Sequence, residues 1–213
     1  TGGLETIVKA INKKRIPFVY HPDIQNPNRY VQTSASSKLR FPEISEKTLE
    51  SLQLESLVTK EPLYLIDNQV LYLGEIPRKT AFEKTGKGFL FVENGKERPD
   101  MLKDDTAVVV NLKGKGLVVL SGCAHSGIIN TVNYAKEITG IDRVHVIMGG
   151  FHLNGADMEK VVQPTIERLK EIDPDYLVPT HCTGRKTINE LENAMPDKFI
   201  LNMSGTKLVF QSQ

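Results

Sequence analysis

The spacing of apolar residues changes along the chain and predicts helices and strands in turn. Near the start, apolar residues recur at intervals of three and four, which predicts an amphipathic helix over about 3–14. A short strand is expected directly after it, at Ile16–Tyr20. In the second half, apolar runs of strand length at 117–120, 143–148 and 176–179 alternate with helical stripes. This alternation is typical of layered α/β (α+β) proteins, so we predict an α/β fold.

The middle of the chain has the pattern of strands and turns. Apolar runs at 62–66 and 70–73 flank Asp67-Asn68-Gln69 and predict a hairpin. Further strands are expected at 89–92 and 106–112.

The last third is expected to hold three helices and a closing hairpin. The helices are predicted from Ile128, around 158–169 and around 186–193, and the hairpin at 199–203 and 207–210. Pro164 predicts a kink or a break in the second helix, because proline has no backbone N–H to donate.

Residues 24–60 are weakly patterned, apart from a possible helix over 46–57. Long irregular segments in compact domains often serve as lids or binding loops. We therefore expect 1–213 to form a single domain, with 24–60 as an insertion or lid that borders the functional site.

Composition narrows the class of protein. A chain of 213 residues with 25% charged residues and a net charge of +1 is ordinary for a globular protein, and gives no indication of nucleic-acid or membrane partners. No apolar run approaches the ~20 residues of a membrane helix. We expect a cytoplasmic protein that acts on a small-molecule substrate; the pattern says nothing about its oligomeric state.

Three histidines stand where α/β folds place their chemistry. His125, His152 and His181 each follow an apolar strand, with small residues such as Gly122, Ala124 and Gly150 nearby. Imidazole is a common ligand of zinc and iron, so the three could share a metal ion that activates water. His145 lies between valines within a strand and is interpreted as a structural histidine.

Other candidates are less specific. Arg78 could hold a phosphate or carboxylate, Asp105 could bind a cation or the substrate, and His21 ends the first strand. Ser126 is interpreted as the N-cap of the following helix, because it lacks the surroundings of a nucleophilic serine. Cys123 and Cys182 each lie near a candidate histidine. We interpret them as reduced, buried residues and leave a bridge or a metal role open.

Three motifs resemble the metallo-β-lactamase superfamily. They are Gly122-Cys123-Ala124-His125-Ser126-Gly127, Gly149-Gly150-Phe151-His152-Leu153 and Pro179-Thr180-His181-Cys182-Thr183-Gly184. With Gly74–Arg78 and Asp104-Asp105, they look most like the branch of dihydropterin–ribofuranosylaminobenzene-phosphate synthase. The resemblance implies an αββα sandwich, with His125 and His181 as metal ligands.

The chain also departs from that pattern. The superfamily's His-x-His-x-Asp-His motif is absent, and Thr1-Gly2-Gly3 looks like the residues that follow it. The resemblance therefore implies a fold that is incomplete at its N-terminus, and a polypeptide that is inactive alone. His152 stands roughly where the superfamily commonly has a metal-bridging aspartate, so it either replaces that ligand or contacts the substrate.

The function implied by the resemblance is that of a metal-dependent hydrolase. A metal-activated water would attack a phosphoester or carbonyl-type substrate, and no side chain is assigned as catalytic beyond that water. Zinc is the expected metal, with iron and manganese as alternatives, and the centre is expected to be dinuclear once the upstream motif is present. Two alternatives stay open: a transferase or synthase acting on a pterin diphosphate, and a non-catalytic binding or sensor module.

Overall fold

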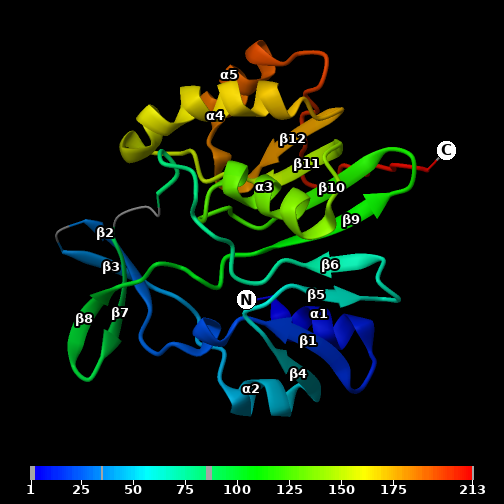
Figure 1. Cartoon of the computed structure of the whole chain (residues 1–213). Helices are drawn as coiled ribbons and strands as arrows, with labels where there is room; N and C mark the ends of the chain where they lie inside the picture. The colour runs from blue at the N-terminus through cyan, green and yellow to red at the C-terminus, as the bar shows by residue number, and fades with distance from the viewer. Residues whose placement is uncertain (1–2, 35, 85–87, 213) are drawn as a thin grey trace. The chain divides into compact units, whose positions relative to one another are not determined.

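The computed structural model describes residues 3–34, 36–84 and 88–212 and is shown in Figure 1. The chain divides into two compact units. The first comprises residues 1–60 and 87–104, and the second comprises residues 61–86 and 105–213. Each unit is described by itself.

The second unit is built on one mixed sheet with the strand order β12-β11-β10-β9-β6-β5. Its strands are β5 (Leu63–Leu65), β6 (Val70–Tyr72), β9 (Ala107–Leu112), β10 (Gly116–Ser121), β11 (Val144–Gly150) and β12 (Tyr176–Thr180). β10, β11 and β12 run parallel, whereas β9 pairs antiparallel with β10 and β6. β10 and β11 are nearly continuous apolar runs, as is typical of central parallel strands.

Helices of the second unit pack against this sheet through one cluster of buried side chains (Figure 1). They are α3 (Ile128–Thr139), α4 (Glu159–Ile172) and α5 (Arg185–Ala194), with the 3₁₀ turns η2 (Ala156–Met158) and η3 (His181–Thr183). The cluster includes Val119 and Ile147 from the strands and Val132, Leu169 and Leu191 from the helices. Because each helix follows a parallel strand, the turns that join them meet at the carboxyl edge of the sheet.

The first unit carries two further sheets. β1 (Ile16–Tyr20) pairs in parallel with β4 (Leu54–Val58), and a four-stranded antiparallel sheet has the order β3-β2-β7-β8. The remaining elements are α1 (Leu4–Ile11), η1 (Pro22–Gln25), β2 (Tyr30–Ser34), β3 (Ser37–Arg40), α2 (Glu46–Ser51), β7 (Phe89–Glu93) and β8 (Lys96–Pro99).

A buried ion cluster stabilises the first unit. The Arg29 side chain is 8% exposed and donates from Nε to Asp100 at 2.5 Å and from both terminal nitrogens to Asp104 at 2.7 Å. Two carboxylates around one planar guanidinium satisfy its donors and compensate its burial. Asp104 is therefore structural here.

Most predicted elements are present, and three expectations were wrong. Residues 24–60 are not an irregular segment but contain β2, β3, α2 and β4. α4 continues through Pro164 without a break, because losing one donor is tolerated where the rest of the helix is packed. Around the turn at Ser204-Gly205, the described residues form no flanking strands; Phe199 makes only an isolated bridge to Leu177.

Two expectations about domains and location stay predictions. These are the single domain and the placing of 24–60 beside the site.

Among the described residues, no helix is both long enough and apolar enough to cross a membrane.

Candidate metal centre

Three parallel strands of the second unit deliver the predicted histidines to one edge of the sheet. Cys123 and His125 follow β10, His152 follows β11, and His181 and Cys182 follow β12. β10 pairs with β11 and β11 with β12, so these three turns are neighbours. The three strand ends that carry the predicted histidines thus lie side by side, and a metal ion shared by the three stays a prediction.

The backbone is strained at each of these turns. Ala124, His152 and His181 have φ values of +52°, +47° and +53°, in the left-handed region that residues with a Cβ seldom adopt. Each such residue costs roughly 1–2 kcal/mol. Strain of this kind collects at functional sites, where the surrounding fold imposes it.

Two glycines at the end of β11 let the turns come this close. A Cβ on Gly149 would lie 2.1 Å from the carbonyl oxygen of Ser121, and one on Gly150 would lie 2.7 Å from the sulfur of Cys182. The Gly150 N–H also donates to the Gly122 carbonyl at 3.0 Å. Glycine is therefore required here for close approach.

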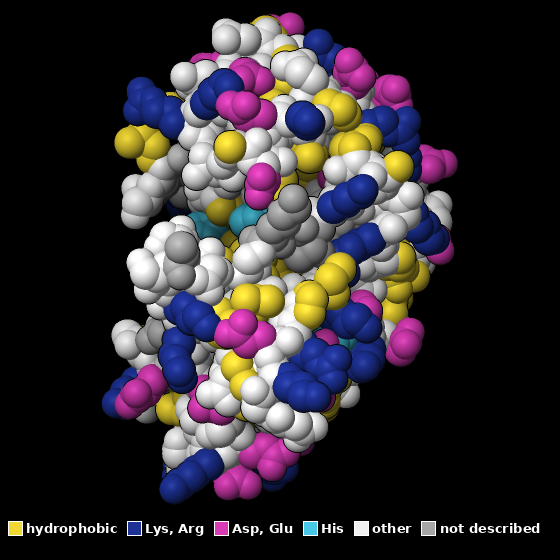
Figure 2. Space-filling view, turned by 90° about the vertical axis from the view of Figure 1, so that its left-hand side faces the viewer, with side chains coloured by type: hydrophobic (Ala, Val, Ile, Leu, Met, Phe, Trp, Pro, Cys, Tyr) yellow, Lys and Arg dark blue, Asp and Glu magenta, His cyan; other side chains and the backbone are white. Residues whose placement is uncertain are grey.

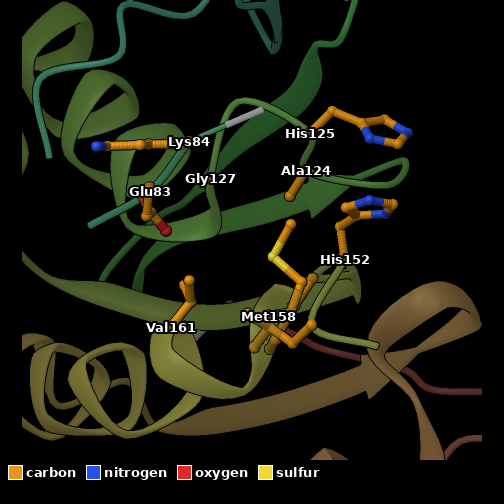
Figure 3. A pocket seen from close by; sticks show the side chains of 10 residues that line it. Glu83, Lys84, Ala124, His125, Gly127, His152, Met158 and Val161 are labelled. Atoms are coloured by element: carbon orange, nitrogen blue, oxygen red, sulfur yellow. The ribbon is translucent and has the colours of Figure 1, made fainter. Parts of the chain in front are cut away.

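His125 and His152 form a pair, with ring centroids 4.1 Å apart and an interplanar angle of 50°. In Figure 3 the two rings point the same way, away from Glu83 and Lys84. Burial lowers the pKa of His152, and the charge of His181 adds to this effect while Asp105 opposes it. The neutral ring that results is the form that binds metal or exchanges a proton.

A small cavity lies beside this pair. Its volume is about 20 Å³, room for about one water molecule. Its lining consists of Glu83, Lys84, Ala124, His125, Gly127, Phe151, His152, Leu153, Met158 and Val161.

Glu83 fixes the start of α3. Its two carboxylate oxygens accept from the N–H groups of Ile129 and Asn130, both at 2.8 Å. The side chain fits because Gly127 has no Cβ; an added one would lie 2.2 Å from the Glu83 carboxyl carbon. Burial raises the pKa of Glu83 to about 7 against the effect of the two hydrogen bonds.

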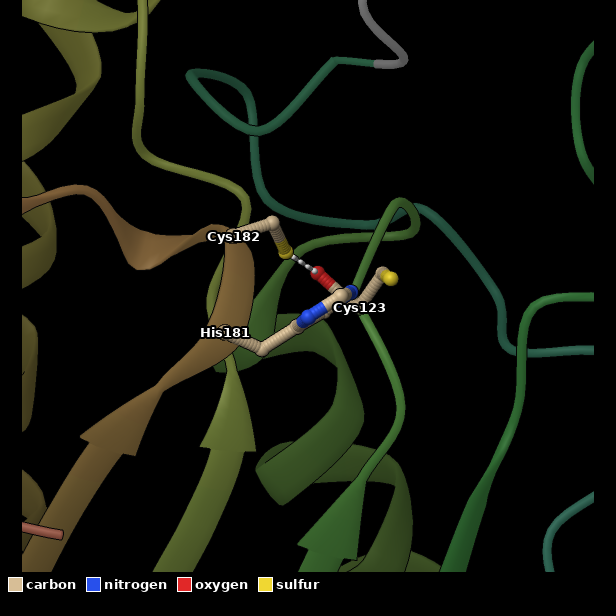
Figure 4. A group of neighbouring side chains, drawn as sticks. All are labelled: Cys123, His181 and Cys182. Carbon is tan, nitrogen blue, oxygen red and sulfur yellow. Dashed lines mark hydrogen bonds between the residues drawn. The ribbon is translucent and has the colours of Figure 1, made fainter. Parts of the chain in front are cut away.

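Cys123, His181 and Cys182 form a second group of metal-binding side chains (Figure 4). Their ligand atoms all lie within 4.8 Å of one another, and the Cys182 thiol donates to the Cys123 carbonyl at 3.5 Å. A hydrogen bond from the Cys123 thiol lowers the pKa of Cys182 to about 7, and the same bond raises the pKa of Cys123 to about 12.

These donors fit a divalent metal. Tetrahedral nitrogen and sulfur ligands of zinc lie about 2.0–2.3 Å from the ion and therefore about 3.3–3.8 Å apart. The ligand atoms of this group, all within 4.8 Å of one another, lie near that spacing. Imidazole and thiolate are also the ligand types that zinc favours.

Comparisons with known proteins place the chain in a family. No family model matches it. It is 33% identical over 202 residues to 7,8-dihydropterin-6-methyl-4-(β-D-ribofuranosyl)-aminobenzene-5′-phosphate synthase of Methanocaldococcus jannaschii. This match covers 93% of this chain and 67% of the synthase. The crystal structure of Tm1679, a metal-dependent hydrolase of the β-lactamase superfamily, superposes with a TM-score of 0.80 over 94% of this chain and 73% of that one, at 21% identity. The chain belongs to the family of this synthase, and its fold is that of the metal-dependent hydrolase of the β-lactamase superfamily.

A second relative matches a shorter part of the chain. It is an uncharacterized protein of the same organism, 34% identical over 149 residues, and the match spans 70% of this chain and about half of that protein. The fold expected from the three motifs and the resemblance to the synthase branch are thus confirmed.

The other predicted site residues have separate surroundings. Asp105 accepts from the Ser126 N–H at 2.8 Å and so holds the turn that carries His125. Arg78 is half-buried, and the next two residues donate their N–H groups to Asn130 at the start of α3. His21 belongs to the first unit and is 2% exposed, where its Nδ1 accepts from the Asp23 N–H. Substrate contacts by these three residues stay predictions.

Two interpretations of polar residues near the site have different outcomes. Ser126 does not cap α3: the N-cap is Gly127, and the 1% exposed Ser126 hydroxyl has no hydrogen-bond partner among the described residues. Glu83, brought in from far along the sequence, takes that role. His145 has the structural surroundings expected of it, with its Nδ1 2.6 Å from Asp175 and its ring edge-on to Tyr176.

Sequence reasoning missed Glu83 and undervalued the cysteines. A glutamate without periodic context gives no signal that it caps a helix 46 positions away. For Cys123 and Cys182 a signal was present, since each lies within two residues of a strand-end histidine.

Proposed function

We propose that this protein is a metal-dependent, hydrolase-like enzyme that acts on a phosphoester or carbonyl-type substrate. The observation that carries the proposal is the placing of His125, His152 and His181 at the ends of three neighbouring parallel strands, with the His125 and His152 rings paired. Family membership supports a catalytic role, since the relative at 33% identity is named a synthase. Zinc in a dinuclear centre is the form we propose.

The residues have distinct roles in this proposal. His125 and His181 would hold the metal, which supplies a Lewis acid and an activated water when bound. His152, kept neutral by burial, would be a further ligand or would exchange a proton with the substrate. Asp105 fixes the His125 turn through the Ser126 N–H, and Arg78 would contact a phosphate or carboxylate of the substrate.

A second activity is favoured by the comparison with the synthase. The named product of that enzyme joins a pterin to an aminobenzene phosphate. A transferase acting on a pterin diphosphate would use the same histidines, with Arg78 holding a phosphate. We also propose a cytoplasmic location and no nucleic-acid partner.

The first test is metal content and turnover of the polypeptide as its gene encodes it. Elemental analysis after dialysis should find at least one metal per chain, and His125→Ala and His181→Ala should each lose it. Turnover on a panel of phosphoesters, thioesters, lactones and pterin diphosphates should fall at least about 100-fold in both variants.

His145→Gln is the matched control, because this histidine is bonded to Asp175 and not directed to the site. Less than one metal per chain, with the variants unchanged, would favour a non-catalytic binding or sensor module.

A further inference from the structure

Cys123, His181 and Cys182 form a group of possible metal ligands that comes from two different turns. It draws one thiol from the turn after β10 and two neighbouring donors from the turn after β12. In Figure 4 the Cys182 sulfur points toward the Cys123 turn, with the His181 ring next to it. Three donor atoms within 4.8 Å of one another, two of them sulfur, form the donor set of a soft metal site.

Two unusual backbone features bring this group together. His181 is held at a φ of +53°, which presents its ring at the end of β12 and directs the next residue back toward β10. Gly150 leaves the space for the Cys182 sulfur, which an added Cβ would meet at 2.7 Å. Neither feature is needed for two cysteines that only fill space.

From this geometry we infer that Cys123, His181 and Cys182 together bind one soft divalent metal ion, with zinc as the natural occupant. Both cysteines bind as thiolates, so binding displaces the two thiol protons to solvent and changes no oxidation state. His181 is exposed while the two cysteines are half-buried, so solvent can reach the group. Three protein ligands with one open position are the arrangement of catalytic rather than structural zinc.

The inference deepens the proposed function and rests on it for the role of the metal. It changes the chemistry of the centre: two thiolates neutralise the charge of a divalent ion, and they favour zinc over the manganese that an all-imidazole and carboxylate site would accept. His125 follows β10 beside this group and would hold the second ion of the proposed dinuclear centre, with the His152 ring next to it.

The test uses cobalt(II) as a coloured substitute for zinc. The reduced, metal-free protein is titrated with cobalt(II) under argon, and the near-ultraviolet charge-transfer band that arises only from cobalt–thiolate bonds is followed. We expect the band to saturate at one equivalent and to disappear when zinc is added. Binding of cobalt(II) without this band would overturn the inference.

Variants assign the band to residues. Cys123→Ser and Cys182→Ser should each weaken it by about half, the double variant should abolish it, and His181→Ala should weaken cobalt binding at least tenfold. Ser126→Ala is the matched control from the same turn and should leave the band unchanged. An undiminished band in the double variant would refute the assignment, and circular dichroism checks that each variant is folded.

A second measurement needs no variant. Zinc should slow alkylation of Cys123 and Cys182 by iodoacetamide at least tenfold in the unaltered protein, and a chelator should restore the rate. Unchanged rates, or a reduced protein that forms a Cys123–Cys182 disulfide in air equally fast with and without zinc, would contradict metal binding.

The outcomes for this site and for the proposed function are separable. A thiolate band with no turnover on any substrate supports the site and removes the hydrolase. Metal-dependent turnover without a thiolate band supports the hydrolase and removes the site.

Discussion

At the scale of single residues, Glu83 connects the folding of the second unit to its site. Its side chain is 6% exposed and accepts the first free N–H groups of α3, the helix that follows the His125 turn. A negative charge at a helix N-terminus is favourable, but burial of that charge is not. The balance is visible in the pKa of Glu83, which burial raises from 4.5 to about 7.

This shift predicts how stability depends on pH. The folded chain binds the Glu83 proton more tightly than the unfolded chain, so folding gains stability as the pH falls from about 7 toward 4.5 and loses it as the pH rises again. Relative to Glu83→Gln, which does not titrate, the metal-free protein should gain about 2–3 kcal/mol in free energy of unfolding between pH 8 and pH 5.

Urea unfolding at several pH values measures this difference. Glu137→Gln, an exposed substitution on the same helix, should shift stability by less than about 0.5 kcal/mol throughout. Parallel pH profiles for the protein and Glu83→Gln would contradict the prediction.

At the scale of elements, α3 has a glycine at each end for different reasons. Gly127 precedes the helix at a φ of +97°, and a Cβ there would lie 2.2 Å from the Glu83 carboxyl carbon. Gly140 ends the helix at a φ of +68° with nothing within 4 Å of the added atom.

Alanine substitution separates the two reasons. Gly140→Ala should cost about 1 kcal/mol in free energy of unfolding, from backbone strain alone. Gly127→Ala should cost at least about 3 kcal/mol, because it also displaces the Glu83 carboxylate from the helix N-terminus. Equal losses in chemical denaturation would mean that the carboxylate moves away freely.

Elements with a strong apolar pattern could be predicted from the sequence, and others could not. β10, β11 and β12 are apolar runs, so their ends and the histidines after them were predicted correctly. β8, by contrast, is Lys96–Pro99 and fully exposed, so its pattern is that of a loop, and its pairing with β7 depends on the neighbouring strand. The residues around Val209 suggested a strand but pair with no strand among the described residues, because apolar spacing does not specify pairing.

The candidate site shows the same limit. The strand ends indicated where His125, His152 and His181 would lie, since parallel strands share a carboxyl edge. The meeting of Cys123 with Cys182 depends on the left-handed turn at His181 and on the space left at Gly150. Neither feature has a pattern in the sequence.

At the scale of the whole molecule, all the proposed metal ligands come from the second unit. Zinc at about 100 times its dissociation constant should therefore stabilise that unit by about 2.7 kcal/mol. Hydrogen exchange should slow up to about 100-fold for protected amides of β10, β11 and α3, and stay unchanged for those of β1 and β2.

His181→Ala serves as the control, since its weaker binding should reduce the slowing of exchange by zinc at the same concentration at least about tenfold. Equal protection of β1 and β10 in the unaltered protein would show that the two units unfold as one, against the division of contacts.

The left-handed residues at the strand ends have a consequence for how the protein can change over evolution or in the laboratory. Ala124, His152 and His181 hold backbone conformations that glycine would adopt at lower cost. Selection for heat resistance alone would therefore favour glycine at these positions, two of which carry proposed ligands. Variants selected only for stability should replace these residues by glycine and lose activity. Variants that keep Ala124, His152 and His181 would show that function was also selected.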